Sequence, residues 1–284
     1  MSTIDELLER KSIRIFEHKP IPDDIKAQLL ECAFAAPTCG TQMLYSIIEV
    51  EDPVTKARLA KICQNQQFIA RAPWLLVFLA DSRRWYDCYE LAGLDPRPPT
   101  ILDMLLSYED ACYAAQNMVV AAQSIGIGSC YIGLIHSDHD EVVKMLDLDQ
   151  YVIPAAVLIL GYTTPRQQRR RKPARFDSRF LVFKDKYRRL SDEELKEMFV
   201  LREQDFDKVV RRIFRTKYQI GPEDGAAVLG SVGKYIYGYG ANQVTRPEDH
   251  PGYIPRAYRP ELAALLSGGD DDDCDVDCPP GDLR

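Results

Sequence analysis

Long apolar runs are missing from this chain. The longest are WLLVFLA at Trp74 to Ala80 and AAVLIL at Ala155 to Leu160, well short of the roughly 18 residues that a membrane-spanning helix needs. The first residues, MSTIDELLERK, are polar and include acids, whereas a secretion signal has a basic and then an apolar stretch. We therefore expect a cytoplasmic protein with no membrane partner.

Cysteine is too sparse for a disulfide scaffold. The chain has 8 cysteines in 284 residues, and six of them show no short paired spacing: Cys32, Cys39, Cys63, Cys88, Cys112 and Cys130. This is typical of small buried side chains in a reducing compartment.

The body of the chain has almost no net charge. The formal net charge is -7, but the last seventeen residues hold seven aspartates against Arg284, which leaves about -1 for the rest. A nucleic-acid-binding protein needs a basic face, and only Arg166 to Arg179 is basic enough to supply one. We expect no nucleic-acid partner.

Several motifs of catalysis and ligand binding are also missing. The four histidines, His18, His136, His139 and His250, lie in no metal-ligand spacing, and we expect His136 and His139 to be solvated near a helix start. No Walker loop occurs. The sequence therefore predicts no metal site and no Ser-His-Asp or Cys-His catalytic set.

Apolar periodicity predicts alternating helices and strands. Helices are expected at about Thr3–Lys11, Asp23–Phe34, Pro53–Ile62, Ile101–Ile125, Asp140–Leu146 and Asp192–Arg215, and strands at Ser46–Glu51, Leu75–Ala80, Cys130–Gly133 and Val152–Gly161. The predicted fold class is α+β (mixed α/β), with a central mixed sheet flanked by helices on both faces. The expected domain spans residues 1–200, followed by an extension over 201–267 and a disordered acidic tail over 268–284.

Local signals add detail to the first two helices. A capping-box pattern begins at Thr3, which predicts the start of the first helix there. In the second helix we expect Ile25, Leu29, Leu30 and Phe34 to face inward.

A basic cluster follows the first helix: Arg10, Lys11, Ser12 and Arg14. Cations at a helix C-terminus complement the helix dipole and are commonly solvated. Alternatively, arginine and serine side chains at this spacing form an anion site, in which the guanidinium binds phosphate through two parallel hydrogen bonds. A second basic run, Arg169 to Lys172 with Arg175, either closes the same pocket or is a solvated loop.

Glycines cluster in the string from Gly126 to Gly133. They follow a helix and lead into a strand, the reverse of the order in a dinucleotide-binding fingerprint. They either end a helix beside a closely packed strand, or let a flat ligand lie against bare backbone.

Five segments in this order resemble the FMN-dependent nitroreductases. They are RKSIRIF from Arg10, the Ala35–Thr38 loop with Gln42, the run Gln66–Pro73, SIGIGSCYIG from Ser124, and LGYTTPRQQRRRKPAR from Leu160. The resemblance spans about Thr3 to Met198 and is closest to the oxygen-insensitive, NADPH-preferring nitroreductase and flavin reductase branch.

The resemblance implies a set of cofactor-binding residues. The FMN phosphate and ribityl chain would be bound by Arg10, Lys11, Ser12 and Arg14, and the phosphate also by Lys172 and Arg175, which stand one residue farther apart than is usual in the family. Thr38 and Gln42 would reach the flavin from the partner subunit, and Gln66 would bond the ring system. The backbone of Tyr131, Ile132, Gly133 and Leu134 would lie along the isoalloxazine.

The resemblance also implies an activity and an assembly. It implies an intertwined homodimer with active sites at the interface. NAD(P)H would reduce FMN, and a nitroaromatic or a quinone would then take a hydride from flavin N5, so that no catalytic side chain is needed. The alternative is an FMN-binding sensor or specialised pathway protein without broad reductase activity.

In the tail, Cys274 and Cys278 suggest a metal or redox pair, although a solubilising or docking tail fits the composition better.

Overall fold

The computed structural model describes residues 2–202 and 204–213. The α-helices are α1 Thr3–Glu9, α2 Asp23–Phe34, α3 Pro53–Ile62, α4 Gln67–Ala70, α5 Arg83–Leu91, α6 Ile101–Ser124, α7 His139–Leu146, α8 Pro165–Gln168, α9 Asp192–Val200 and α10 Phe206–Ile213. Three short 3-10 turns also occur: η1 Cys39–Thr41, η2 Ile135–Asp138 and η3 Ser178–Phe180.

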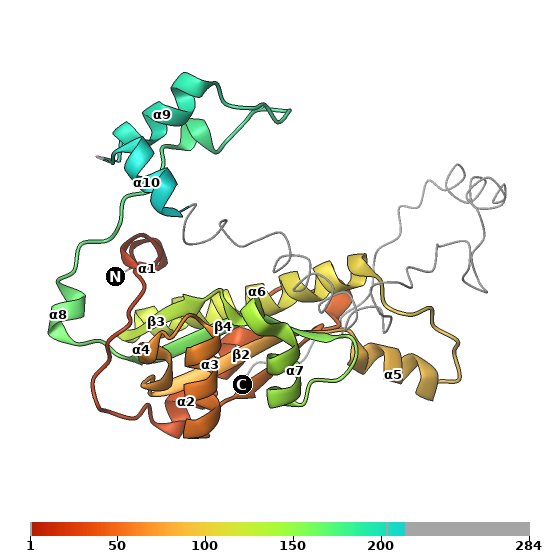
Figure 1. Ribbon diagram of the computed structural model, residues 1–284. Coiled ribbons are helices and arrows are strands. Elements are labelled where there is room, and N and C mark those ends of the chain that lie inside the picture. The colour runs from red at the N-terminus through yellow and green to blue at the C-terminus, as the bar shows by residue number, and fades with distance from the viewer. Residues whose placement is uncertain (1, 203, 214–284) are drawn as a thin grey trace, which may run out of the picture. The chain divides into compact units, whose positions relative to one another are not determined.

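Four strands form an antiparallel sheet at the centre of the fold (Figure 1): β1 Tyr45–Glu49, β2 Trp74–Asp81, β3 Ile127–Ile132 and β4 Val152–Tyr162. Their spatial order is β1-β2-β4-β3. Ser12 adds a parallel bridge to Ser129 of β3. β2 and β4 are central, which explains their nearly continuous apolar sequences.

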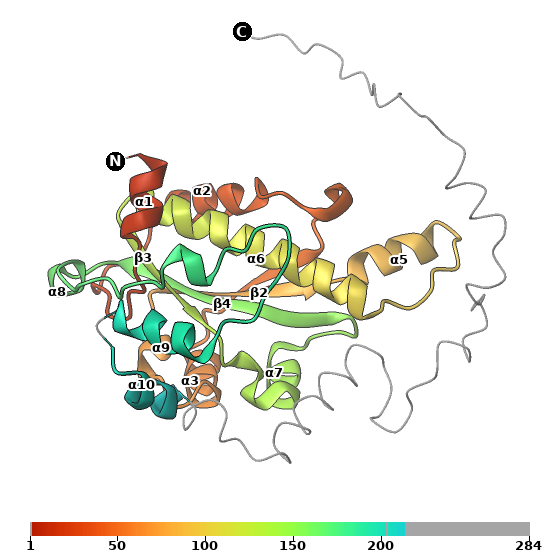
Figure 2. The ribbon, with the colours of Figure 1, turned by 90° about the horizontal axis from the view of Figure 1, so that it is seen from above.

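Helices cover both faces of this sheet, as Figures 1 and 2 show. On one face α2 and α6 pack against alternate β2 residues, including Trp74, Leu76 and Phe78. On the other face residues from α3, α4 and α7 pack with Leu75 and Val77. The predicted α+β fold class, with helices on both faces of a central sheet, is confirmed by the related structures reported below. The sheet was expected to be mixed, but its four strands pair antiparallel, and the parallel pairing comes from the bridge between Ser12 and Ser129.

The two ends of the sheet carry different loops. Trp74, Leu160 and Ser129 are in register at one end, here called the Ser129 end. Tyr45 is in register with Ala80 at the opposite end, here called the Tyr45 end. A residue at one end is therefore separated from the other end by most of the length of β2.

Several sequence expectations need correction. Ser2, not Thr3, caps α1, and it exchanges capping-box bonds with Asp5. Phe34 is 47% exposed because it is the last residue of α2 and lines an open pocket. His139 is 2% exposed, so the prediction that it is solvated is wrong.

Other differences concern element boundaries. β3 begins at Ile127, three residues before the expected start, so Gly128 lies inside the strand. The helix expected at Asp192–Arg215 is two helices, α9 and α10. The expected tail, Cys274, Cys278 and most of the extension lie outside the described residues.

Candidate functional site

The segment that follows α1 runs beside β3. Ile13 N donates to the Ser129 carbonyl at 2.8 Å. A Cβ on Gly128 would lie 2.7 Å from Ile13 Cγ1 and still closer to Thr163 Oγ1. The absence of a side chain at Gly128 therefore lets the basic segment approach the sheet.

The basic loop after β4 is bonded to that segment in both directions. Lys11 Nζ donates to the carbonyl oxygen of Arg170 at 2.6 Å and also to that of Gln168. In return, the Arg170 guanidinium donates to the Ser12 carbonyl, and Lys172 Nζ donates to the Leu8 carbonyl. These bonds bring together the two basic clusters that are far apart in sequence.

Positive charge accumulates where the two clusters meet. Burial, together with the positive charges of Arg175 and Arg10, lowers the pKa of Lys172. Burial raises the pKa of the Tyr131 hydroxyl, and Arg10 acts in the opposite direction, so Arg10 lies near both Lys172 and the end of β3. Despite the extra residue between them, Lys172 and Arg175 are close enough to interact.

These cations have no carboxylate partner among residues 2–202 and 204–213, where the ion pairs involve other basic residues. Arg10 Nη1 is buried and has no hydrogen-bond partner within the same ranges. A buried cationic donor without a partner is costly. The arrangement therefore fits an anion such as a phosphate.

The end of β3 provides bare backbone just beyond Tyr131, whose hydroxyl is within reach of the charge of Arg10. Gly133 is exposed, and a Cβ placed on it would meet no atom within 4 Å. Tyr131 is half-buried, and Ile132 is buried beneath the surface. The space above Gly133 is thus open to a flat ligand, in contrast with Gly128.

Gln66 stands at the N-terminus of α4. Its side-chain Nε2 donates to the Cys63 carbonyl at 2.8 Å, which leaves Oε1 and the second amide hydrogen for a ligand. The Arg14 guanidinium carbon lies 5.8 Å from the centre of the Phe68 ring of α4. Gln66 is therefore on the side of the molecule that carries the basic segment.

Thr38 and Gln42 lie elsewhere, in the loop that enters β1 at the Tyr45 end. The Thr38 hydroxyl donates to Asp110 of α6 and accepts from Met43 N at 2.7 Å. Gln42 Nε2 donates to the Tyr89 hydroxyl at 2.9 Å.

The predicted site residues thus form two groups within one subunit. Arg10, Lys11, Ser12, Arg14, Gln66, Lys172 and Arg175 belong to the side of the Ser129 end, and Thr38 and Gln42 to the Tyr45 end. The Tyr131–Leu134 segment begins midway along the sheet, since Ile132 is in register with Val157 of β4 and through it with Val77 of β2, and it is linked to the first group by the charge of Arg10 acting on Tyr131. Sequence reasoning missed Asp110, which the described contacts place at the centre of the second group. The sequence offered only a partial signal: Asp110 stands one turn before Ala114 on the same helix face, which favours burial but does not reveal the bonds to the loop.

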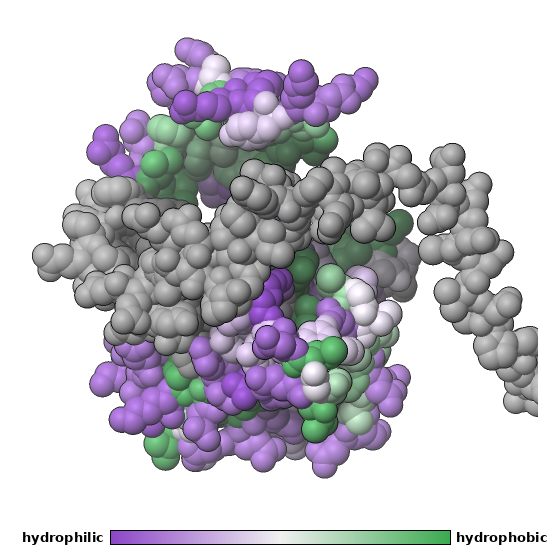
Figure 3. All heavy atoms as spheres, turned by 90° about the vertical axis from the view of Figure 1, so that its right-hand side faces the viewer, coloured by the Kyte–Doolittle hydropathy of each residue, from purple (hydrophilic) through white to green (hydrophobic). Residues whose placement is uncertain are grey.

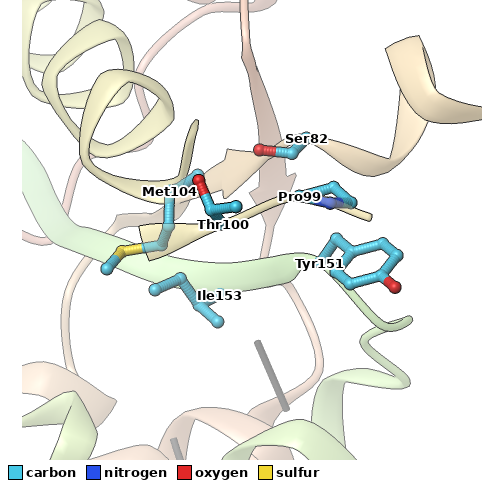
Figure 4. Close-up of a pocket in the computed structure, with 7 residues that line it drawn as sticks. Ser82, Pro99, Thr100, Met104, Tyr151 and Ile153 are labelled. Carbon is cyan, nitrogen blue, oxygen red and sulfur yellow. The ribbon is translucent and has the colours of Figure 1, made fainter. Parts of the chain in front are cut away.

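Two pockets lie away from the basic clusters. The first, shown in Figure 4, is lined by Ser82, Thr100 and Tyr151 among others and has a volume of about 10 Å³, which is enough for one water molecule at most. The second, of about 520 Å³, lies between α2 and β1. None of the described residues that line these two pockets is a predicted cofactor-binding residue.

Comparison with known proteins decides the family. A model of the nitroreductase family matches residues 7–162. The chain belongs to the nitroreductase family. This membership confirms the family predicted from the five sequence segments and makes the chain an oxidoreductase enzyme.

Individual members of the family extend this result. The chain is 34% identical over 163 residues to the FMN reductase (NADPH) of Bacillus subtilis, a match that covers 57% of this chain and 66% of that protein. It is similar in structure to the NfrA1 nitroreductase of the same species, with a TM-score of 0.68, 26% identity and coverage of 80% and 97% of the two chains.

A second solved structure shares the fold. The NADPH:FMN oxidoreductase of Vibrio harveyi, solved in complex with NAD+, has a TM-score of 0.71 at 24% identity and covers 81% of this chain and 97% of its own. The cofactors expected from the sequence agree with the names of these relatives. Within residues 2–202 and 204–213, no helix of this nitroreductase is long and apolar enough to cross a membrane.

Proposed function

We propose that this nitroreductase binds FMN and transfers hydride from NAD(P)H to nitroaromatics, quinones or related electron-poor small molecules. Bound FMN would supply the redox chemistry, with donor and acceptor using flavin N5 in turn in a ping-pong reaction. The protein's own task is then to bind the cofactor and hold each co-substrate over the ring at about 3–3.5 Å.

The observation that carries this proposal is the convergence of uncompensated cations at Arg10, Lys172 and Arg175. In the proposed site they hold the FMN phosphate together with Lys11, Ser12 and Arg14. Lys11 Nζ uses two of its three donors on main-chain carbonyls, so one remains for the phosphate.

The remaining predicted residues would hold the ring. The open backbone of Tyr131, Ile132, Gly133 and Leu134 would lie along one face of the isoalloxazine, with Gly133 leaving room for it. Gln66 would bond the ring edge through the amide atoms that Cys63 does not occupy. These residues bind and orient, and no side chain is assigned a catalytic proton transfer.

The proposed active form is an intertwined homodimer with active sites at the interface. One subunit separates Thr38 and Gln42 from the cations, so a site that contains both groups requires a second copy. Large apolar side chains are exposed on α1, α5 and α6, including Leu8, Leu91 and Leu102, and Figure 3 shows apolar surface among polar side chains on one face. We assign the FMN-binding domain to residues 1–200 and propose that the extension over 201–267 wraps the partner.

The relatives' names favour NADPH as the donor, since the Bacillus subtilis relative is called FMN reductase (NADPH).

The proposed function is tested by an absorption spectrum of the purified protein, recorded before and after addition of NADPH, with and without a quinone. We expect a flavin spectrum that NADPH bleaches and a quinone restores repeatedly. A colourless protein that does not take up FMN contradicts the proposal, and bound FMN without hydride uptake from either nicotinamide supports the sensor alternative.

A further inference from the structure

One buried carboxylate holds both ends of the loop formed by Thr38–Leu44, called the β1 loop below. Asp110 of α6 is 2% exposed. Its Oδ1 accepts from Cys39 N at 2.9 Å, and its Oδ2 accepts from Leu44 N at 3.1 Å and from the Thr38 hydroxyl. A single side chain therefore fixes both the start of the loop, at Thr38 and Cys39, and its end at Leu44, where the chain enters β1.

The β1 loop needs such an anchor because its backbone is strained. Thr41 and Met43 have φ angles of 56° and 51°, in the left-handed region that side chains with a Cβ disfavour, above all β-branched ones. Such a path persists only where surrounding contacts impose it. Charge-assisted hydrogen bonds from a buried carboxylate are of the stronger kind.

The loop held in this way presents Gln42 in one orientation. The Gln42 carbonyl accepts from Trp85 Nε1 at 2.7 Å, and its side-chain amide donates to the Tyr89 hydroxyl at 2.9 Å. Asp110 itself lies beneath the loop and is too buried to touch a ligand.

We propose that Asp110 is a positioning residue for the flavin site of the partner subunit. Its carboxylate sets the path of the β1 loop, and through it the placement of Thr38 and Gln42 over the partner's FMN. The inference rests on the proposed function, because it assumes that the loop reaches a flavin held by the other subunit's cations.

The first test compares Asp110→Asn with a matched control, Ser107→Ala. Ser107 is fully buried one turn earlier on α6. Its Oγ lies 2.7 Å from Ser82 Oγ and donates to the Asp103 carbonyl at 2.8 Å, so it is bonded outside the β1 loop. Both variants remove a buried polar interaction from the same helix.

Amide hydrogen exchange and FMN titration of the apo protein provide the readouts. In Asp110→Asn we expect the Cys39 and Leu44 amides to exchange at least about tenfold faster and the Kd for FMN to rise about tenfold. Ser107→Ala should change neither, even if its melting temperature falls equally. An equal loss of affinity in both variants, or no loss in Asp110→Asn, overturns the inference.

Mixed dimers test the transfer between subunits. A dimer of one Asp110→Asn subunit and one Arg14→Ala subunit should contain one intact site, formed by the cations of the first and the β1 loop of the second. We expect one FMN per mixed dimer at wild-type affinity. If Asp110 acted within its own subunit, both sites would be impaired and no high-affinity FMN would bind.

The two homodimers separate failure of this inference from failure of the proposed function. Normal FMN binding by Arg14→Ala contradicts the proposed phosphate site. Loss of FMN from Arg14→Ala with normal binding by Asp110→Asn contradicts only the role of Asp110. If Asp110→Asn does not fold, Thr38→Val replaces it, since it removes one of the three donors and leaves α6 unchanged. Faster exchange of Cys39 is then expected, and unchanged exchange overturns the inference.

Discussion

Lys11 and Arg170 each bond the main chain of the other's segment. Lys11 Nζ donates to the Arg170 carbonyl at 2.6 Å, and the Arg170 guanidinium donates to the carbonyl of Ser12, which follows Lys11. These bonds between the two segments are donated by cationic side chains, so the same bonds that fix the loop also concentrate positive charge. An anion bound there would lower the repulsion and further stabilise the junction.

Replacing Lys11 should loosen the basic loop. Lys11→Met removes the donor to the carbonyls of Gln168 and Arg170, and we expect trypsin to cleave after Arg169 to Arg171 several-fold faster, corresponding to about 1 kcal/mol of lost local stability. Lys19→Met is the control, because Lys19 lies over the Tyr162 ring at 4.2 Å. Mass spectrometry of a timed digest measures the rates, and equal cleavage of the two variants contradicts the role of Lys11.

Arg14 should contribute directly to FMN affinity. Its side chain is exposed beside α4, so Arg14→Ala should leave the fold intact. Loss of a charge-assisted bond worth roughly 1.5–3 kcal/mol weakens binding by about one to two orders of magnitude. The control is Arg58→Ala on α3, where Arg58 pairs with Glu141. Flavin content after dialysis gives the answer, and retention of FMN by Arg14→Ala counts against a phosphate contact.

Gly128 and Gly133 should respond oppositely to alanine. At Gly128 a methyl group meets Ile13 and Thr163, so Gly128→Ala should destabilise the protein by about 1–3 kcal/mol. At Gly133 the space is open, so Gly133→Ala should keep apo stability within about 0.5 kcal/mol while lowering FMN affinity. Urea unfolding and flavin titration separate the effects. Unchanged affinity in Gly133→Ala would show that the ring lies elsewhere.

Helices whose apolar residues recur at a regular helical spacing could be predicted from the sequence. α3 has the predicted bounds and α6 ends one residue earlier than predicted, because their buried positions recur at helical spacing and each has a clear N-terminal signal. α5 was not predicted, since none of its residues is buried. Its aromatic side chains Trp85 and Tyr89 do share one face, one turn apart, and contact each other and Gln42, so this face was a signal that the sequence prediction overlooked.

The candidate site was only partly predictable for a different reason. The basic residues could be grouped by resemblance, but their junction depends on bonds to main-chain carbonyls, as with Lys172 and Leu8, which no side-chain pattern records. Asp110 was missed because an acid within a long helix usually lies on the solvated side. Its role appears only when the β1 loop folds back over α6.

His139 should make stability depend on pH. It is 2% exposed, and this burial is the main reason why its pKa falls from 6.5 to about 4. The charge of His136 also lowers the pKa, whereas the charge of Asp140 raises it. The unfolded state therefore binds the proton more tightly than the folded state does. The stability that comes from burying His139 as a neutral side chain is fully present above about pH 6.5, declines as the pH falls towards 4, and changes no further below pH 4. Between pH 7 and pH 4.5 the free energy of unfolding should fall by about 2–3 kcal/mol through this group.

His139→Gln isolates that contribution from the other groups that titrate in the same range. Urea unfolding at pH 7 and pH 4.5 should show a smaller loss of stability in this variant than in the wild type, with the difference close to the fall expected for His139. His136→Gln serves as the comparison, because burial also lowers the pKa of His136 but the ring is less buried. Equal pH dependence in the wild type and His139→Gln would mean that His139 is protonated in the native protein at acidic pH without cost, and would contradict its burial as a neutral side chain.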